Sequence, residues 1–145
     1  MNKVIGPRPA FVSVGHGRFS EAEVWEKAHP IAVRVHKLAQ SMRSSRYASL
    51  RNQIIRAAES IPSNIVEGSR KATNADFARF LGYALNSASE LEYQLMLARD
   101  IGAIEEEESL LLINALTEIR KMLHGLIRRV RSSPMPDRRR RPERE

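Results

Sequence analysis

Residues 105–130 read EEEESLLLINALTEIRKMLHGLIRRV, and this stretch decides the fold. Its large apolar side chains recur at alternating spacings of four and three residues, which place them on one face of an α-helix. The four glutamates stand at the start, where carboxylates complement the positive end of a helix dipole. A long helix with one face to bury is therefore predicted. The apolar positions are Leu112, Leu116, Ile119, Leu123, Leu126 and Val130.

Three upstream segments, 20–42, 47–67 and 73–101, repeat this pattern and predict three more helices. The first and third begin with a hydroxyl residue three positions before an acidic one, the spacing of an N-terminal cap. These pairs are Ser20 with Glu23 and Thr73 with Asp76. The predicted inward positions are Val24, Ala28, Ile31, Val35, Leu38 and Met42, then Leu50, Ile54, Ala57, Ile61 and Ile65, then Phe77, Leu81, Ala84, Ala88, Leu91, Leu95 and Ala98.

Two prolines and two glycines punctuate the predicted helices. Pro30 has no amide hydrogen to donate to the carbonyl of residue 26, so a bend is expected near residues 26–30. Pro62 predicts a kink or a break in the second helix for the same reason. Gly68 and Gly102 are predicted to be the left-handed residues that follow the second and third helices.

Four amphipathic helices joined by short connections predict an all-α protein, an antiparallel up-down-up-down four-helix bundle. No segment shows the alternating pattern of a strand, and no internal repeat is present. We expect the bundle to span residues 20–131. A flexible N-terminal arm over 1–19 and a disordered, arginine-rich tail over 132–145 are expected to flank it.

The composition excludes several classes of protein. A chain of 145 residues with 42% hydrophobic side chains fits one domain with one core. The absence of cysteine excludes disulfides, thiol catalysis and thiolate metal sites. No apolar run approaches the ~18 residues of a membrane span, and residues 1–19 lack the apolar core expected of a signal peptide. A soluble cytoplasmic protein with no membrane partner is predicted.

The net charge of +7 is concentrated near the C-terminus. Residues 1–119 carry 14 basic and 14 acidic side chains, whereas residues 120–145 carry 10 basic and three acidic ones. Arginine donates paired hydrogen bonds to phosphate, so we favour binding to a nucleic-acid backbone over a merely solvated surface. Of the two nucleic acids, RNA rather than DNA is the expected partner. No aromatic motif for base-specific reading is present. The predicted contacts are Arg120, Lys121, Arg128, Arg129, Arg131, Arg138, Arg139, Arg140 and Arg141.

A line of polar side chains runs beside the apolar stripe of the second helix, and the third helix has a counterpart. A turn around residues 69–73 predicts facing pairs of Gln53 with Glu90, Arg56 with Ser87, and Ser60 with Tyr83. We interpret this seam as a hydrogen-bonded contact that fixes helix register or joins subunits; a ligand pocket is the alternative. Its residues are Gln53, Arg56, Ser60, Asn64, Glu67, Ser87, Glu90 and Gln94.

The sequence gives no support for an enzyme or a metal site. A di-metal bundle needs two Glu-x-x-His pairs, and this chain has one, Glu26 with His29. Lys121 stands where a second pair, ending at His124, needs glutamate. No nucleophile elbow, phosphate-binding glycine loop or zinc-protease motif occurs. We therefore expect no catalytic residues, no metal and no cofactor.

Four stretches, VWEKA at 24–28, LRNQIIRAAESIPSNIVEG at 50–68, FARFL at 77–81 and SASELEYQL at 87–95, resemble one known family. It is the four-helix-bundle family encoded in intervening sequences of bacterial large-subunit ribosomal RNA genes. That family is similar to the accessory variability determinant proteins of diversity-generating retroelements. The match covers about residues 22–131, and residues 60–68 are its most specific part.

The resemblance implies an antiparallel bundle that assembles into a homopentameric ring with a basic surface and no catalytic activity. For the retroelement members it implies binding to RNA or DNA and association with a reverse transcriptase. Pro30 departs from the family pattern, and the cluster at 138–141 lies beyond the shared region. Our leading hypothesis is a non-enzymatic, RNA-binding accessory protein. The alternative is a protein-interaction scaffold with no direct nucleic-acid role.

Overall fold

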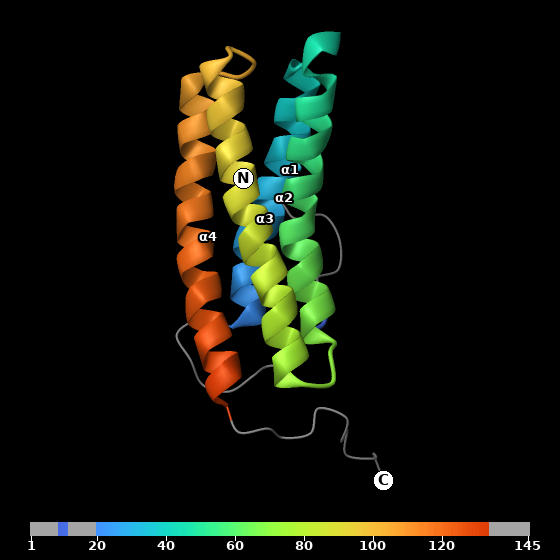
Figure 1. Ribbon diagram of the computed structural model, residues 1–145, viewed down its shortest axis with the longest axis vertical. Coiled ribbons are helices and arrows are strands. Elements are labelled where there is room, and N and C mark those ends of the chain that lie inside the picture. The colour runs from blue at the N-terminus through green and yellow to red at the C-terminus, as the bar shows by residue number, and fades with distance from the viewer. Residues whose placement is uncertain (1–8, 12–19, 134–145) are drawn as a thin grey trace.

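All four predicted helices are present in a computed structural model of the chain, which describes residues 9–11 and 20–133 (Figure 1). The elements are α1 (Glu21–Ser41), a short 3-10 helix η1 (Ser45–Tyr47), α2 (Ala48–Ser69), α3 (Asn74–Asp100) and α4 (Glu106–Ser132). No strand occurs in these two ranges, so the all-α prediction is confirmed. Most of the predicted arm and tail lies outside the described residues.

The helices form an antiparallel four-helix bundle in which each packs beside its neighbour in sequence (Figure 1). The α2–α3 and α3–α4 interfaces are the most extensive, and a smaller α1–α4 interface closes the bundle. The α2–α3 connection and the end of α4 share one end of the bundle, where the Asn74 amide donates to the Ser133 carbonyl at 3.4 Å. The α3–α4 connection and η1 lie at the opposite end.

The predicted helix ends at Ser20, Thr73 and Gly102 are confirmed. The Glu23 amide donates to Ser20 Oγ at 3.2 Å, and the Asp76 amide donates to Thr73 Oγ1 at 3.1 Å. Each bond satisfies one of the amides that a helix start leaves without an internal partner. Gly102 has a φ of 75°, the left-handed conformation that ends α3.

The apolar stripes of the four helices meet in one core. Every predicted inward position of α3 and α4 is buried, and so are most of those in α1 and α2; Leu38 and Leu50 are half-buried. Phe77 is the largest side chain with no exposed surface. Alanines such as Ala84 and Ala88 lie between the larger residues, which lets the helices approach closely.

The two internal prolines do not break their helices, contrary to the break considered for Pro62. α1 continues from Glu21 to Ser41 through Pro30, and α2 continues from Ala48 to Ser69 through Pro62. Each proline removes one backbone hydrogen bond. Pro62 is buried and Pro30 half-buried, so packing against neighbouring helices opposes the local disruption.

The prediction that Gly68 follows α2 as a left-handed residue is wrong. Gly68 lies inside α2, and among the described residues only Gly102 has a positive φ. A Cβ on Gly68 would lie 2.8 Å from the Phe80 Cβ and 3.0 Å from Phe77 Cδ2. Glycine is required here by the close approach of α3, and not by backbone conformation.

Candidate nucleic-acid interface

The solvent face of α4 carries a basic stripe formed by Lys121, His124, Arg128 and Arg131. These side chains follow one another at spacings of three, four and three residues, and all four are exposed. Leu123, Leu126 and Val130 anchor the opposite face of the same turns in the core, so the stripe is held facing outward. Within the described residues, Lys121, Arg128 and Arg131 have no ion pair, and their charges are available to a polyanion.

The other predicted contacts of α4 are placed differently. Arg120 is half-buried, and its guanidinium forms a 2.7 Å ion pair with Glu92 of α3. Its Nε is buried without a hydrogen-bond partner. Arg129 is also half-buried and lies on the helix face away from the stripe. The structure therefore separates Lys121, Arg128 and Arg131 from these two arginines.

Four further predicted phosphate contacts belong to the C-terminal tail. They lie outside the described residues and remain predictions: Arg138, Arg139, Arg140 and Arg141.

The polar seam between α2 and α3 exists, but its predicted register is wrong by one helical turn. Ser60 Oγ lies 2.8 Å from Ser87 Oγ, whereas the predicted partner of Ser60 was Tyr83. α2 continues two residues beyond the predicted end at Glu67, which shifts the pairing along both helices. Because α2 and α3 meet through Ser60 and Ser87, the seam joins helices of the same chain.

The remaining seam residues bond mainly within their own helices. Asn64 Nδ2 donates to the Ser60 carbonyl at 2.8 Å, and Gln94 Nε2 donates to Glu90 Oε1 at 3.1 Å. Gln53 donates to Ser49 Oγ, and Glu67 pairs with Lys71. Arg56 and Glu90 are both exposed and form no ion pair with each other in the structure.

Sequence reasoning missed a shallow groove between α1 and α2. The stacked rings of Trp25 and His29, 4.8 Å apart, line one part of it, and Pro62 and Ser63 of α2 also line it. Phe11, from the short described segment 9–11, packs 6.1 Å from the Trp25 ring. The i, i+4 spacing of Trp25 and His29 was the available signal. The groove itself depends on how α1 and α2 pack, which spacing does not reveal.

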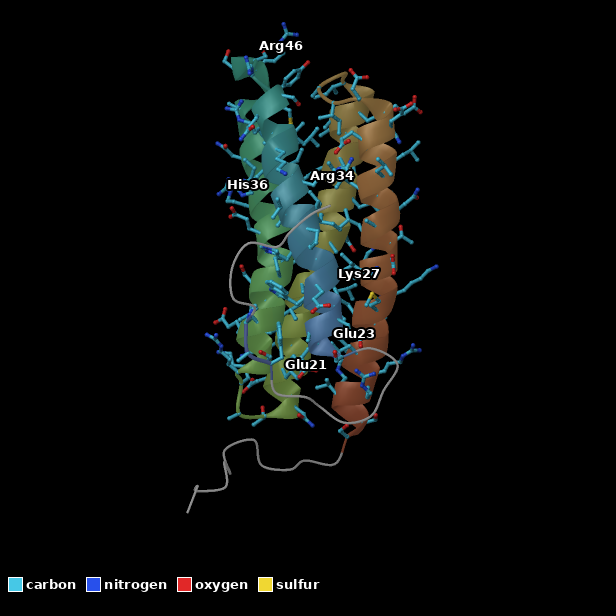
Figure 2. The ribbon with its side chains drawn as sticks, turned by 180° about the vertical axis from the view of Figure 1, so that it is seen from behind. Glu21, Glu23, Lys27, Arg34, His36 and Arg46 are labelled. Atoms are coloured by element: carbon cyan, nitrogen blue, oxygen red, sulfur yellow. The ribbon has the colours of Figure 1, made fainter. Side chains whose placement is uncertain are left out.

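Side chains on both edges of α1 contact acidic residues of the neighbouring helices; Figure 2, seen from behind the view of Figure 1, labels Arg34 and His36 on the two sides of α1. Arg34 binds Glu108 of α4 through two hydrogen bonds of 2.6 and 3.0 Å, and these bonds hold the pKa of the Glu108 carboxyl below its usual value. On the other edge, His36 Nε2 lies 2.6 Å from Glu59 of α2.

The part of the chain that the structure describes contains no group of three histidine, aspartate or glutamate side chains able to hold a metal ion. Over the same residues, no helix is long and apolar enough to cross a membrane.

The fold and the stripe together place the chain in one class: small, basic, all-α proteins built as a four-helix bundle. A model of the 23S rRNA-intervening sequence protein family matches residues 20–125. The chain belongs to this family, and the resemblance predicted from the sequence is confirmed to that extent. The likeness to retroelement accessory proteins stays a prediction.

A solved structure supports the same assignment. It is a protein with unknown function from the S23 ribosomal protein family of Bacteroides thetaiotaomicron, and it is 33% identical in sequence. The match covers 72% of this chain and 97% of that one, with a TM-score of 0.68. No curated protein matches the chain.

Proposed function

We propose that this protein is a non-enzymatic RNA-binding protein that contacts the phosphate backbone through the basic stripe of α4, extended by the arginine-rich tail. The observation that carries the proposal is the set of three exposed cations, Lys121, Arg128 and Arg131, that have no acidic partner within the described residues. The three cations share one face of a single helix, within the C-terminal segment 120–145 that carries the whole net charge of the chain. A polyanion gains from each of them.

The mode of binding follows from the kind of side chains present. Guanidinium groups donate parallel hydrogen bonds to phosphate oxygens, which recur along any nucleic-acid strand. The stripe therefore supplies affinity for nucleic acid that does not depend on the base sequence. Release of condensed counterions makes such affinity fall steeply as salt rises.

The test measures the salt dependence of binding to a fluorescently labelled RNA hairpin. We expect the variant Lys121→Gln/Arg128→Gln/Arg131→Gln to bind more weakly at low salt. The slope of log affinity against log salt should also become shallower by up to about 2.7, since each lost phosphate contact removes about 0.9 on duplex nucleic acid.

The matched control is Lys37→Gln/Arg43→Gln/Arg46→Gln, which removes the same charge from exposed positions on α1 and near η1. This control variant should keep most of the wild-type slope of log affinity against log salt. Equal losses in both triple variants would show that net charge, and not the stripe, sets the affinity. Wild-type affinity that does not change with salt would exclude the phosphate mechanism.

A protein-interaction scaffold is the second candidate, because several large apolar side chains are exposed at the α3–α4 end of the bundle. They are Tyr93, Met96, Leu97, Ile101, Leu110 and Leu111. Self-association into a ring, and contact with a reverse transcriptase, would both use such a surface. Capture of a reverse transcriptase from nuclease-treated extract, with the α4 triple variant as effective as wild type, would favour this candidate.

A further inference from the structure

A small aromatic cluster stands at the end of the bundle that holds the α2–α3 connection. Phe80 and Tyr83 lie one turn apart on α3, with ring centroids separated by 5.3 Å and planes tilted by 69°. Phe80 is half-buried, and its Cβ lies close to Gly68 of α2. Tyr83 is 45% exposed, and the structure gives its hydroxyl no hydrogen-bond partner among the described residues. An edge contact to Phe80 thus orients an exposed aromatic ring.

Two cations frame this cluster. Lys71 Nζ lies 4.6 Å from the centroid of the Phe80 ring, and Arg79 Cζ lies 5.6 Å from it. Lys71 comes from the α2–α3 connection, and Arg79 from the first turns of α3. Both charges therefore lie over the ring of Phe80, which attracts them, and Phe80 is the aromatic neighbour of Tyr83.

Each cation also has a carboxylate one turn away on its own segment. Lys71 Nζ lies 3.8 Å from Glu67, and Arg79 lies 3.3 Å from Asp76. Exposed pairs of this kind contribute little and are easily exchanged for another anion. Arg70, the adjacent exposed cation, forms no ion pair within the described residues.

The cluster lies at the same end of the bundle as the last turns of α4, which carry the C-terminal part of the basic stripe (Figure 1). The hydrogen bond from Asn74 at the start of α3 to Ser133 after α4 establishes this proximity. On α3, Arg79 is exposed, and a Cβ built on Gly82 would meet no atom within 4 Å. No neighbouring helix therefore covers α3 at Gly82, the residue before Tyr83, and the Tyr83 side chain is 45% exposed.

We propose that Tyr83 is a stacking platform for one unpaired base of the bound RNA, with Lys71 and Arg79 contacting the phosphates that flank that base. The proposal rests on the function proposed above. Every base has an aromatic face, so stacking on Tyr83 adds affinity for single-stranded RNA without a preferred sequence. Phe80 is the positioning residue that holds the platform.

The experiment compares a single-stranded oligouridylate with a blunt RNA duplex of equal length, each bound to the full-length protein and followed by fluorescence anisotropy. We expect Tyr83→Leu to weaken binding of the single strand by about fivefold to a hundredfold, the range for loss of one stacked base. Binding of the duplex should stay unchanged, because its bases are already stacked. Tyr83→Trp should retain the single-strand affinity.

Tyr93 supplies a matched control on the same helix. It is 64% exposed, and the structure gives it no ring or cation contact within the described residues. Tyr93 also belongs to the exposed apolar surface named above, so light scattering first establishes that Tyr93→Leu has the same mass as wild type; with equal mass, both RNA affinities should be unchanged. Tyr83 and Tyr93 are exposed, so neither substitution threatens the core, and circular dichroism should show equal helix content.

The outcomes separate this proposal from the one it rests on. If Tyr83→Leu weakens neither RNA, or both equally, the platform is excluded while the α4 stripe stands. If wild type binds neither RNA, both proposals fail. A selective loss with Tyr83→Leu and its recovery with Tyr83→Trp support the platform.

Discussion

Gly68 shows how one residue can set the distance between two helices. It lies in the last turn of α2, and glycine costs up to about 1 kcal/mol relative to alanine in helix propensity. The position is buried, and Phe77 and Phe80 of α3 come within 3.0 Å of the space that a side chain would occupy. The local cost is offset by the close packing of α2 on α3 that the missing Cβ allows.

We expect Gly68→Ala to destabilise the fold by about 1 kcal/mol. Overpacking a core costs about 1–3 kcal/mol, and the gain in helix propensity returns only part of that. Urea unfolding at neutral pH measures the change.

Gly82→Ala in α3 is the control, because no atom lies within 4 Å of its added Cβ. This variant should be stabilised by about 0.5–1 kcal/mol. A Gly68→Ala protein as stable as Gly82→Ala would refute the close-approach explanation.

The individual residues that sequence could predict are those governed by local rules. Ser20 and Thr73 cap their helices by accepting a hydrogen bond from the amide three residues later. Such a contact involves only residues that are close in sequence, so the sequence predicts it. Gly68 was misassigned because the same residue satisfies a helix-end rule and a packing constraint. Arg120 was grouped with the free cations because its partner, Glu92, lies on another helix. Spacing along one helix carries no signal of such a pair.

At the scale of elements, α1 is the helix held by charge as well as by packing. Its interface with α4 is the least extensive of the four, and Arg34 and Lys27 bridge it to Glu108 and Glu118 (Figure 2). The Lys27–Glu118 pair is exposed and 3.7 Å long, so it contributes little. The bidentate Arg34–Glu108 pair is the stronger of the two interactions between α1 and α4.

This pair makes part of the stability pH-dependent. The hydrogen bonds from Arg34 lower the pKa of Glu108 in the folded state below the ordinary value of 4.5. A depressed carboxyl pKa stabilises the fold above the unfolded-state value, and this contribution disappears as pH falls through the folded-state pKa. We expect Glu108→Gln to be less stable than wild type at pH 7 and equally stable at pH 2.

Glu107→Gln is the control for the helix dipole, because Glu107 lies in the same first turn of α4, is exposed and has no ion pair within the described residues. Any loss shared by both variants reflects the dipole. The additional loss in Glu108→Gln reflects Arg34. If chemical denaturation shows the same pH dependence in both, the ion pair has no separate effect.

Helix existence was predictable and helix register was not. The spacing of apolar residues fixes which face of each helix is buried, and every predicted inward position of α3 and α4 is buried. The pairing of α2 with α3 depends on where α2 ends, and two more residues of helix moved Ser60 from Tyr83 to Ser87. The α1–α2 groove likewise depends on interhelical packing, so it could be seen only in the structure.

At the scale of the whole molecule, the basic stripe of α4 and the exposed apolar surface lie toward different ends of the bundle. The stripe ends at Arg131, near the α2–α3 connection, whereas Ile101, Leu110 and Leu111 lie around the α3–α4 connection. Leu110 and Leu111 are 47% and 55% exposed and adjacent, on a helix that also buries a full apolar face. A surface for self-association at this end would leave the basic end open to RNA.

We therefore expect the protein to be a homo-oligomer, with a pentamer expected from the family resemblance, and light scattering should give a multiple of the 16.5 kDa chain mass. Leu110→Glu/Leu111→Glu should lower that mass while leaving helix content unchanged, because both side chains are exposed. Asn114→Glu, an exposed change on the same helix, should not affect assembly. A wild-type protein that scatters as a monomer would contradict the prediction, and dissociation by the double variant with RNA binding intact would show that the two ends act independently.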